Sequence, residues 1–246
     1  MIYMQSENLK HKRTFVTKLI ILAPVVTVLM NIFAPLWFQI NSFNWWYVLL
    51  YPGFLTLLCA LIEQRDSGKL KYRAVFPLPV SLTKVWKAKI GMSGIYLVLG
   101  NLLFLALNLA GGFTILMVHE LPLTVGVWQT AAGVICIILV SLWEVPLCLW
   151  VSNRLGIFFA VFLNVGVGSV LGIFMATSNL WVICPYSWVP HLMIYVLGIL
   201  PNGEPVAGGG KQIPYMTILF TVLFALLFFV ILTNLSAQKF ERQEAK

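Results

Sequence analysis

The tetrapeptide Gly91-Met92-Ser93-Gly94 places a serine between two glycines, a pattern in which some intramembrane serine proteases carry their nucleophile. Such a serine needs a histidine or another base within hydrogen-bond reach. The chain contains three histidines, His11, His119 and His191. Whether a protease is feasible therefore depends on which side of the fold each histidine occupies.

Glu144 is the acidic residue that lies deepest within an apolar run, and Pro146 follows it two positions later. An ionisable residue inside a membrane span is a functional hypothesis by default. We predict a snorkelling or helix-pairing role for Glu144, with Arg154 as a candidate partner. Four polar residues in apolar runs are predicted to hydrogen-bond between helices: Asn101, Asn108, Gln129 and Asn164.

Nucleotide and metal sites are not predicted for this chain. The glycine-rich run at Gly208–Lys211 lacks both the first glycine and the Ser or Thr of a phosphate-binding loop. Cys59, Cys136 and Cys148 lie in apolar runs and Cys184 in a predicted external segment, a distribution that gives neither a disulfide framework nor a zinc spacing. We expect no cofactor on this chain, so ATP, if used, would bind with Mg to a partner subunit.

The composition requires lipid as the solvent. Of the 246 residues 60% are hydrophobic and 10% charged, with a mean hydropathy of +0.92, whereas soluble domains carry about 25% charged residues. The formal net charge of +8 comes from basic residues beside apolar runs. This placement favours contact with anionic membrane lipids and argues against nucleic acid as a partner.

Six apolar segments have the length needed to cross a bilayer, so the sequence predicts an all-α integral membrane protein with residues 1–246 as a single domain. The first segment is too long for the apolar core of a signal peptide and is predicted to remain uncleaved. The six predicted spans are Leu19–Ile40, Trp46–Ile62, Ile90–Val118, Leu123–Val151, Leu155–Met175 and Met216–Leu235.

The basic residues predict the orientation of these spans. With the N-terminus in the cytosol, every Lys and Arg except Lys211 falls on the cytosolic side, which also places the C-terminus there. Ser93 is then cytosolic, whereas His119 and His191 are external, about a bilayer thickness away. We therefore interpret the serine and its glycines as small residues that let helices pack closely.

The stretch from Ala176 to Tyr215 is predicted to be a pair of re-entrant or interfacial helices, because Pro185 and Pro190 interrupt it and a seventh span would move the basic C-terminus outside. Aromatic residues at the membrane surface are predicted as interfacial anchors: Trp181, Tyr186 and Trp188 here, and Trp45, Trp46 and Tyr47 between the first two spans.

The largest predicted cytosolic feature is the loop Glu63–Pro79, in which a short helical segment lies between Gly68 and Pro77. After it, Ser81 is a candidate N-cap for an amphipathic helix leading into the third span. Leu82, Val85, Trp86 and Ile90 form its apolar stripe, and Lys84, Lys87 and Lys89 lie largely off the stripe.

This loop resembles that of permease subunits of ABC type-2 exporters, in which an acidic residue, an arginine, a glycine, a Pro-x-Pro-like turn and a lysine follow the second span. The matching positions are Glu63, Arg65, Gly68, Pro77, Pro79 and Lys89. The resemblance implies six spans and a coupling helix in this loop that presses on a cytosolic ATPase subunit. The further residues expected to contact that ATPase are Lys69, Lys71, Tyr72, Arg73, Val75 and Phe76.

The opening segment from Ser6 to Ile20, with Ala23-Pro24 after it, resembles lantibiotic-immunity permeases of the MutE/EpiE type. That likeness implies a second homologous permease, two ATPase copies, location in the cell membrane of a Gram-positive bacterium, and expulsion of a lantibiotic-like peptide from the membrane. The residues expected to meet the peptide or the membrane interface are Trp45, Trp46, Trp181, Trp188 and His191. The alternatives are an exporter of bacitracin or a lipid-like compound, a passive immunity or scaffold protein, and an intramembrane protease.

Overall fold

The computed structural model describes residues 2–68, 72, 77, 79–207 and 214–242, and every regular element among them is helical. Four helical stretches are long and apolar enough to cross a membrane: Pro35–Ser67, Leu82–His119, Glu144–Ala176 and Tyr215–Glu241. The bent pair Ile2–His11 and Phe15–Asn31 would make a fifth. The prediction of an all-α, multi-span chain is therefore confirmed at this coarser level.

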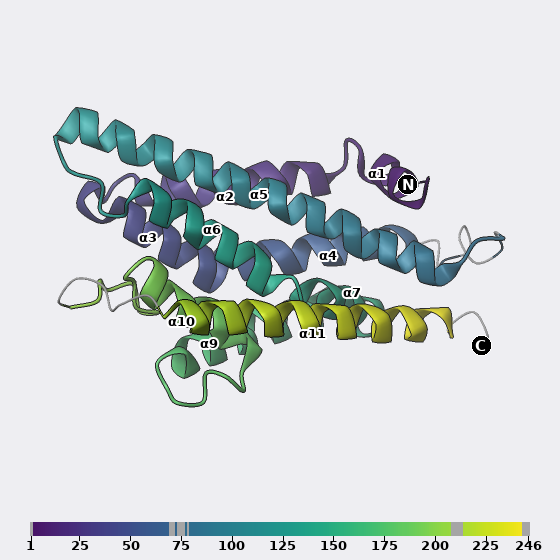
Figure 1. Ribbon diagram of the computed structural model, residues 1–246. Coiled ribbons are helices and arrows are strands. Elements are labelled where there is room, and N and C mark those ends of the chain that lie inside the picture. Colours follow the sequence, from purple (N-terminus) through teal and green to yellow (C-terminus); the bar gives the residue numbers. More distant parts are fainter. Residues whose placement is uncertain (1, 69–71, 73–76, 78, 208–213, 243–246) are drawn as a thin grey trace.

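The first two helices are joined by a sharp bend. Helix α1 (Ile2–His11) meets α2 (Phe15–Asn31) at 75°, and Arg13 adopts a left-handed conformation with φ +61° in the turn between them. Helix α1 therefore lies across the end of the bundle, while α2 runs along it (Figure 1).

The boundary between the first two predicted spans was wrong. Helix α2 ends at Asn31, and a new helical stretch begins at Pro35, running through η1 (Pro35–Trp37), α3 (Phe38–Trp45), the π-helix η2 (Trp46–Leu50) and α4 (Tyr51–Ser67). A proline disfavours helical geometry in the residue before it but is well suited to the first turn of a helix. Trp45 and Trp46 consequently lie inside a helix and not in a loop between spans.

Helix α5 (Leu82–His119) is a continuous rod of 38 residues. Its N-cap is Ser81, whose side chain accepts a hydrogen bond from the backbone N–H of Lys84 at 3.4 Å, as predicted. The predicted apolar stripe is buried. Lys89 is also fully buried, so the prediction that it lies off the buried face was wrong.

The middle of the chain folds back on itself. Helix α6 (Val127–Ser141) is followed by a break and then by α7 (Glu144–Leu155), because Pro146 has no N–H with which to continue the helical ladder. After Gly156, with φ +85°, the chain continues as α8 (Ile157–Val161), the π-helix η3 (Phe162–Gly168) and α9 (Ser169–Ala176). Residues 144 and 164 would be about 30 Å apart in a straight helix, but their side chains are hydrogen-bonded. The stretch Glu144–Ala176 is therefore a hairpin.

The segment after α9 does not form a membrane-length helix. Helix α10 (Trp188–Val196) has nine residues and follows the single turn η4 (Pro185–Ser187). Pro185 begins η4, whereas Pro190 is accommodated in the first turn of α10. The last helix, α11 (Tyr215–Glu241), runs the length of the molecule along one side (Figure 1).

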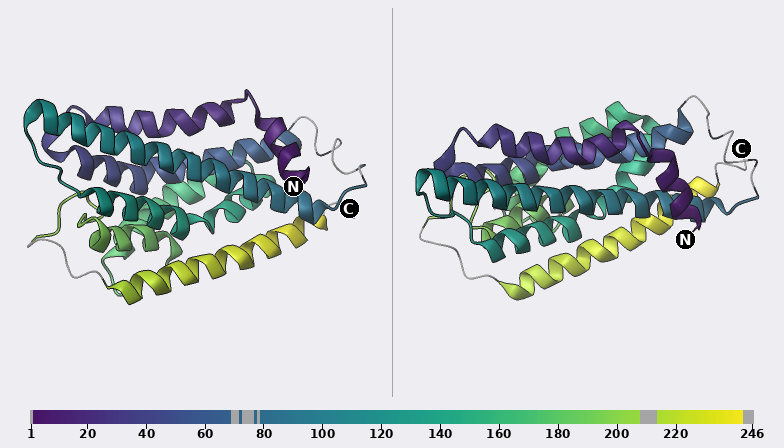
Figure 2. Two further views of the ribbon diagram at one scale, coloured as in Figure 1. Left: turned by 45° about the horizontal axis from the view of Figure 1, so that its top comes forward. Right: turned by 90° about the horizontal axis from the view of Figure 1, so that it is seen from above.

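The helix ends divide the molecule into two distinct ends. Helix α1, the end of α4, the start of α5 and the end of α11 lie together in all three views, opposite the connection from α5 to α6 (Figures 1 and 2). Most of the described lysines and arginines belong to these segments or adjoin them, so we call this first end the basic end; Lys18 lies in α2 and Arg154 in α7. Large apolar side chains remain exposed along α2, α8, α9 and α11, as expected for a surface that faces lipid.

Aromatic rings fill the core between α3, α4 and α5. The Trp46 and Phe104 rings stack with centroids 4.8 Å apart, and Phe43 meets Phe104 edge-on at 5.1 Å. Glycine makes room for neighbouring rings: a Cβ atom on Gly100 would lie 2.8 Å from the Phe54 ring. Within the Gly91–Gly94 motif, a Cβ atom on Gly91 would lie 3.3 Å from Cε of Met4 in α1, whereas one on Gly94 would meet nothing within 4 Å.

Candidate functional site

A cluster of buried charges lies at the basic end of the bundle, centred on Lys89. Its ammonium nitrogen is 3.1 Å from Oε2 of Glu63 and 3.0 Å from Oδ2 of Asp66. Lys89 is 0% exposed and Glu63 1%. Glu63 and Asp66 lie three positions apart on α4 and therefore share the face that meets α5. We call this group, with the residues bonded to it, the Lys89 cluster.

Helix α1 joins the Lys89 cluster through Lys10. The Lys10 ammonium group lies 3.0 Å from Oδ2 of Asp66 and 2.7 Å from Oε1 of Glu7. Burial acts to raise the pKa of the Glu7 carboxyl, but the neighbouring His11 and Lys10 outweigh it and hold that pKa below its usual value. A chain of alternating charges thus connects α1 to α4 and α5.

The loop after α4 is fastened to the same cluster by Tyr72. The Asn153 amide of α7 donates hydrogen bonds to the Tyr72 hydroxyl at 2.8 Å and to Oε1 of Glu63 at 2.7 Å. The Tyr72 ring lies 5.2 Å from Nζ of Lys89 and packs edge-on against Phe240 of α11. One loop residue therefore contacts α5, α7 and α11 at once.

The predicted ATPase-contact residues lie in different environments. Glu63 and Tyr72 are buried within the chain, so neither side chain is presented to a partner. Arg65 is exposed on the last turn of α4, and Gly68 follows that helix as its C-cap. The remaining predicted contacts, and the helical segment predicted to carry them, lie outside the described residues: Lys69, Lys71, Arg73, Val75 and Phe76.

The predicted polar residues of the spans differ in what they contact. Asn101 accepts a hydrogen bond from the Trp46 indole N–H at 3.0 Å, which joins α5 to η2 as predicted. Gln129 was wrongly assigned to helix pairing, because it is exposed and accepts a hydrogen bond from the backbone N–H of Gly126, capping α6. Asn108 is fully buried, and neither its amide nitrogen nor its oxygen has a hydrogen-bond partner among the described residues.

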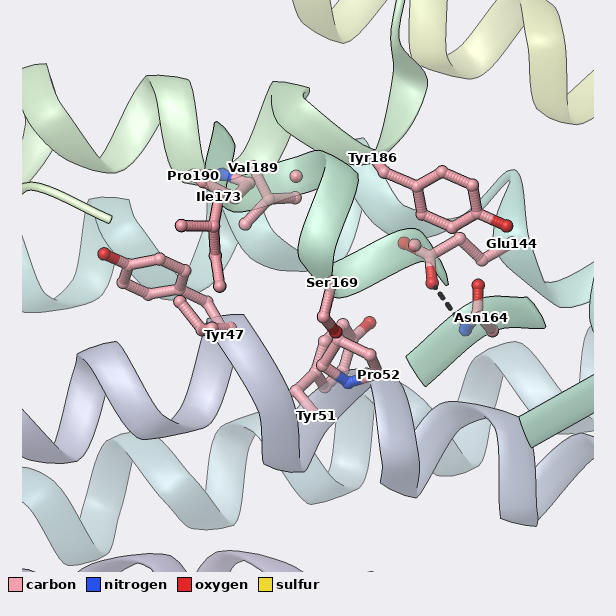
Figure 3. Close-up of a pocket in the computed structure, with 13 residues that line it drawn as sticks. Tyr47, Tyr51, Pro52, Glu144, Asn164, Ser169, Ile173, Tyr186, Val189 and Pro190 are labelled. Carbon is pink, nitrogen blue, oxygen red and sulfur yellow. Dashed lines mark hydrogen bonds between the residues drawn. The ribbon is translucent and has the colours of Figure 1, made fainter. Parts of the chain in front are cut away.

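Glu144 pairs with Asn164, so the helix-pairing interpretation of both residues is supported, while Arg154 lies at the far end of α7. The Asn164 amide donates to Oε2 of Glu144 at 3.0 Å and to Oγ1 of Thr56 at 2.7 Å, joining α7, η3 and α4. Figure 3 shows the Glu144 carboxylate beside Asn164, with the Tyr186 ring close by. These residues border a cavity of about 20 Å³, which we call the Glu144 cavity.

The predicted surface aromatics are only partly at the surface. Trp45 is 44% exposed, whereas Trp46 is 0% exposed. Trp188 is buried and donates to the carbonyl of Val182 at 3.1 Å. Trp181 stacks on His191, with ring centroids 3.9 Å apart, and His191 Nδ1 lies 2.6 Å from the carbonyl of Ala176. Among these five residues, Trp45 has the side chain most open to a substrate or to headgroups.

Ser93 lies on the packed side of α5. Its hydroxyl is buried and donates to the Lys89 carbonyl at 2.9 Å, one turn earlier in α5. His119 lies at the opposite end of the same 38-residue helix. The arrangement thus provides no base for a serine nucleophile from that histidine.

Some residues of both sites were missed in the sequence. Lys10, Asp66 and Asn153 complete the Lys89 cluster, and Thr56 and Ser169 border Asn164 and the Glu144 cavity. The spacing of Glu63 and Asp66 was a usable signal, because two acids on one face of an apolar helix require a buried cation.

No protein-family model, curated protein or solved structure matches the chain.

Proposed function

We propose that this chain is the membrane permease subunit of an ABC-type exporter that expels a lantibiotic or a similar membrane-active peptide from the cell membrane. The observation that carries the proposal is the attachment of the loop between α4 and α5 to the Lys89 cluster. A loop that transmits force from an ATPase must be tied stiffly to the helices that it moves. Tyr72 ties this loop to α5, α7 and α11, and the ion pairs extend the connection to α1.

The proposed topology has six spans with both termini in the cytosol. The spans are α2, Pro35–Ser67, α5, the combined α6 and α7, the combined α8, η3 and α9, and α11. The reversal of the chain at Gly156 supports counting α6 with α7 as one span and α8, η3 and α9 as another. The gathering of basic segments at one end of the bundle supports the cytosolic assignment of that end (Figure 2).

Arg65 is proposed to contact the ATPase. It is exposed at the end of α4, one position before Asp66 of the Lys89 cluster, so a push on Arg65 would reach α5 through a buried ion pair and α1 through a partly buried one. Beside it lies an open cavity of about 650 Å³, bordered by residues of α1, α2 and α4. This recess is proposed as the seat for a protruding element of the ATPase.

The second permease is proposed to pack against α11 or against the segment formed by α8, η3 and α9. Of the most apolar part of each candidate span, only 11% is buried in α11 and 22% in Glu144–Ala176, against 56% in Pro35–Ser67. The two least enclosed spans are therefore the faces with most apolar surface left for another subunit or for lipid.

The test is to express the chain in a lantibiotic-sensitive strain, alone and together with any ABC ATPase and second permease that are found encoded beside its gene. Wild type should raise peptide resistance and stimulate ATP hydrolysis by the purified complex. Arg65→Glu should lose resistance while the chain still folds. Glu120→Lys, a charge reversal of equal size at the opposite, exposed end of α5, is the matched control.

Two outcomes would change the proposal. Resistance to bacitracin or to a lipid-like compound, without resistance to lantibiotics, would keep the permease and replace its substrate. Resistance that persists when the ATPase is inactivated would overturn the exporter and favour passive immunity.

A further inference from the structure

Glu144 is a carboxylate for which no described residue is a cationic partner. The ion pairs formed between described residues involve Glu7, Glu63 and Asp66, at the basic end. An ionised carboxylate held among apolar side chains is strongly unfavourable unless a positive charge compensates it. The titratable side chains around Glu144 are all without positive charge: Tyr47, Tyr51, Cys59, Cys148 and Tyr186. No described residue supplies the compensating charge at Glu144.

The Glu144 cavity also contains oxygen atoms without partners. Both hydrogens of the Asn164 amide nitrogen are used, one by Glu144 and one by Thr56, and its Oδ1 atom is left without a donor. The Asn164 side chain is buried, with 2% of the residue exposed. The hydroxyl of Ser169 is likewise buried without a partner. Both residues line the cavity that Glu144 borders (Figure 3).

The backbone around the cavity is unusual as well. Tyr47 and Val48 reach it from the π-helix η2, and Asn164 and Gly168 reach it from the π-helix η3. Such wide turns are rare and are found frequently at functional sites. Two of them bordering the cavity that holds one buried carboxylate is a second, independent indication that a ligand belongs here.

The size and chemistry of the cavity limit the ligand. A volume of about 20 Å³ holds a species the size of one water molecule. The atoms without partners are oxygens, which suit a hard cation. With a single carboxylate the site matches one positive charge, whereas Ca²⁺ or Mg²⁺ would leave a second positive charge uncompensated among apolar side chains.

We propose that Glu144, Asn164 and Ser169 form an intramembrane site that binds one monovalent cation, either a proton on Glu144 or a sodium ion. Asn164 holds the Glu144 carboxylate by its amide N–H and turns its own oxygen toward the cation. Occupancy of the site fastens the hairpin α7–α8 to α4, because the cation neutralises the charge at the point where these helices meet. This inference concerns the interior of the chain and does not rest on the proposed export.

The experiment uses the purified full chain in detergent and compares thermal unfolding in sodium chloride with that in choline chloride. For a sodium site, sodium should raise the Tm of the wild type by about 3 °C or more and should leave Glu144→Gln unchanged. Ser169→Ala, which removes one oxygen and keeps the carboxylate, should need several-fold more sodium. Glu120→Gln, at an exposed acid, is the matched control and should respond like the wild type.

For a proton site, the Tm should be the same in the two salts, and the infrared spectrum at neutral pH should contain a carboxylic-acid band that Glu144→Gln abolishes. The inference is overturned if the Tm is the same in sodium chloride and choline chloride and the Glu144 carboxyl is ionised at neutral pH. The comparison of salts on the wild type does not require any variant to fold, and Glu144→Ala is used to assign the infrared band if Glu144→Gln is not recovered.

Discussion

Lys89 of α5 and Glu63 of α4 form an ion pair that is sealed from solvent, with Nζ of Lys89 3.1 Å from Oε2 of Glu63. Because burying two charges is costly in itself, the pair adds little net stability. Removing one partner alone, however, leaves an uncompensated buried charge and is strongly destabilising. It is therefore the most sensitive point at which to test the Lys89 cluster.

Lys89→Met should destabilise the protein by about 3–5 kcal/mol, because it leaves Glu63 buried without a cation. Adding Glu63→Gln should recover part of this loss, since the uncompensated charge is then gone. Thermal unfolding of the detergent-solubilised chain measures both effects. Lys87→Met, at an exposed lysine of the same helix, should stay within about 0.5 kcal/mol of wild type. A double variant no better than Lys89→Met would show that packing, and not charge, causes the loss.

Trp46→Phe should cost about 1–3 kcal/mol in stability, because it leaves the buried oxygen of Asn101 without its donor. The exposed neighbour Trp45→Phe is the matched control and should unfold like wild type. Both variants are then assayed for peptide resistance. Reduced resistance with normal stability in Trp45→Phe would mark that residue as a substrate contact. Wild-type stability in Trp46→Phe would contradict a structural role for the indole.

Gly100→Ala should destabilise the chain by about 1–3 kcal/mol, although alanine is the better helix former, because the new methyl group would overlap the Phe54 ring. Gly94→Ala lies on the same helix with nothing within 4 Å of the added carbon, and it should be neutral or stabilising by up to about 1 kcal/mol. Phe54→Leu in the Gly100→Ala background should restore stability. If both glycine variants unfold alike, the close approach of Phe54 is not what requires Gly100.

The two ends of the bundle should be labelled differently in intact cells. In a Cys184→Ser background, in which the three remaining cysteines are buried, a membrane-impermeant thiol reagent should label Glu120→Cys and not Arg65→Cys. After the cells are opened, both should react. Labelling of Arg65→Cys in intact cells would overturn the cytosolic assignment of the basic end.

The sequence predicted the helical class and most span positions, because twenty-residue apolar runs are a strong and local signal. It misplaced the break between α2 and α3, since Ile32, Phe33 and Ala34 are as apolar as their neighbours and only Pro35 marks the boundary. The position of the break depends on backbone geometry before proline and not on hydropathy. Pro35 did indicate the break, but we gave more weight to the continuous apolar run around it.

The candidate sites were less predictable because their partners are distant in the chain. Glu144 was identified from its apolar surroundings, but its contact with Asn164 depends on the reversal at Gly156. Lys89 looked like one of three surface lysines, and only the packing of α4 against α5 turns it inward. Conversely, Gln129 satisfies the polar-in-a-span pattern yet serves as a local helix cap. A hydropathy pattern identifies polar residues in a span but not what they touch.

Helix α11 is the least enclosed of the candidate spans, and it is also the last of them in the chain. During biosynthesis, every residue of the ion pairs around Lys89 and of the cavity at Glu144 has been made before Tyr215 leaves the ribosome. What α11 adds is a closing contact, in which Ser236 accepts a hydrogen bond from Trp86 and Phe240 covers Trp86 and Tyr72. The residues of the charged interior are thus synthesised first, and the final helix is available to cover them from one side only after they have been made.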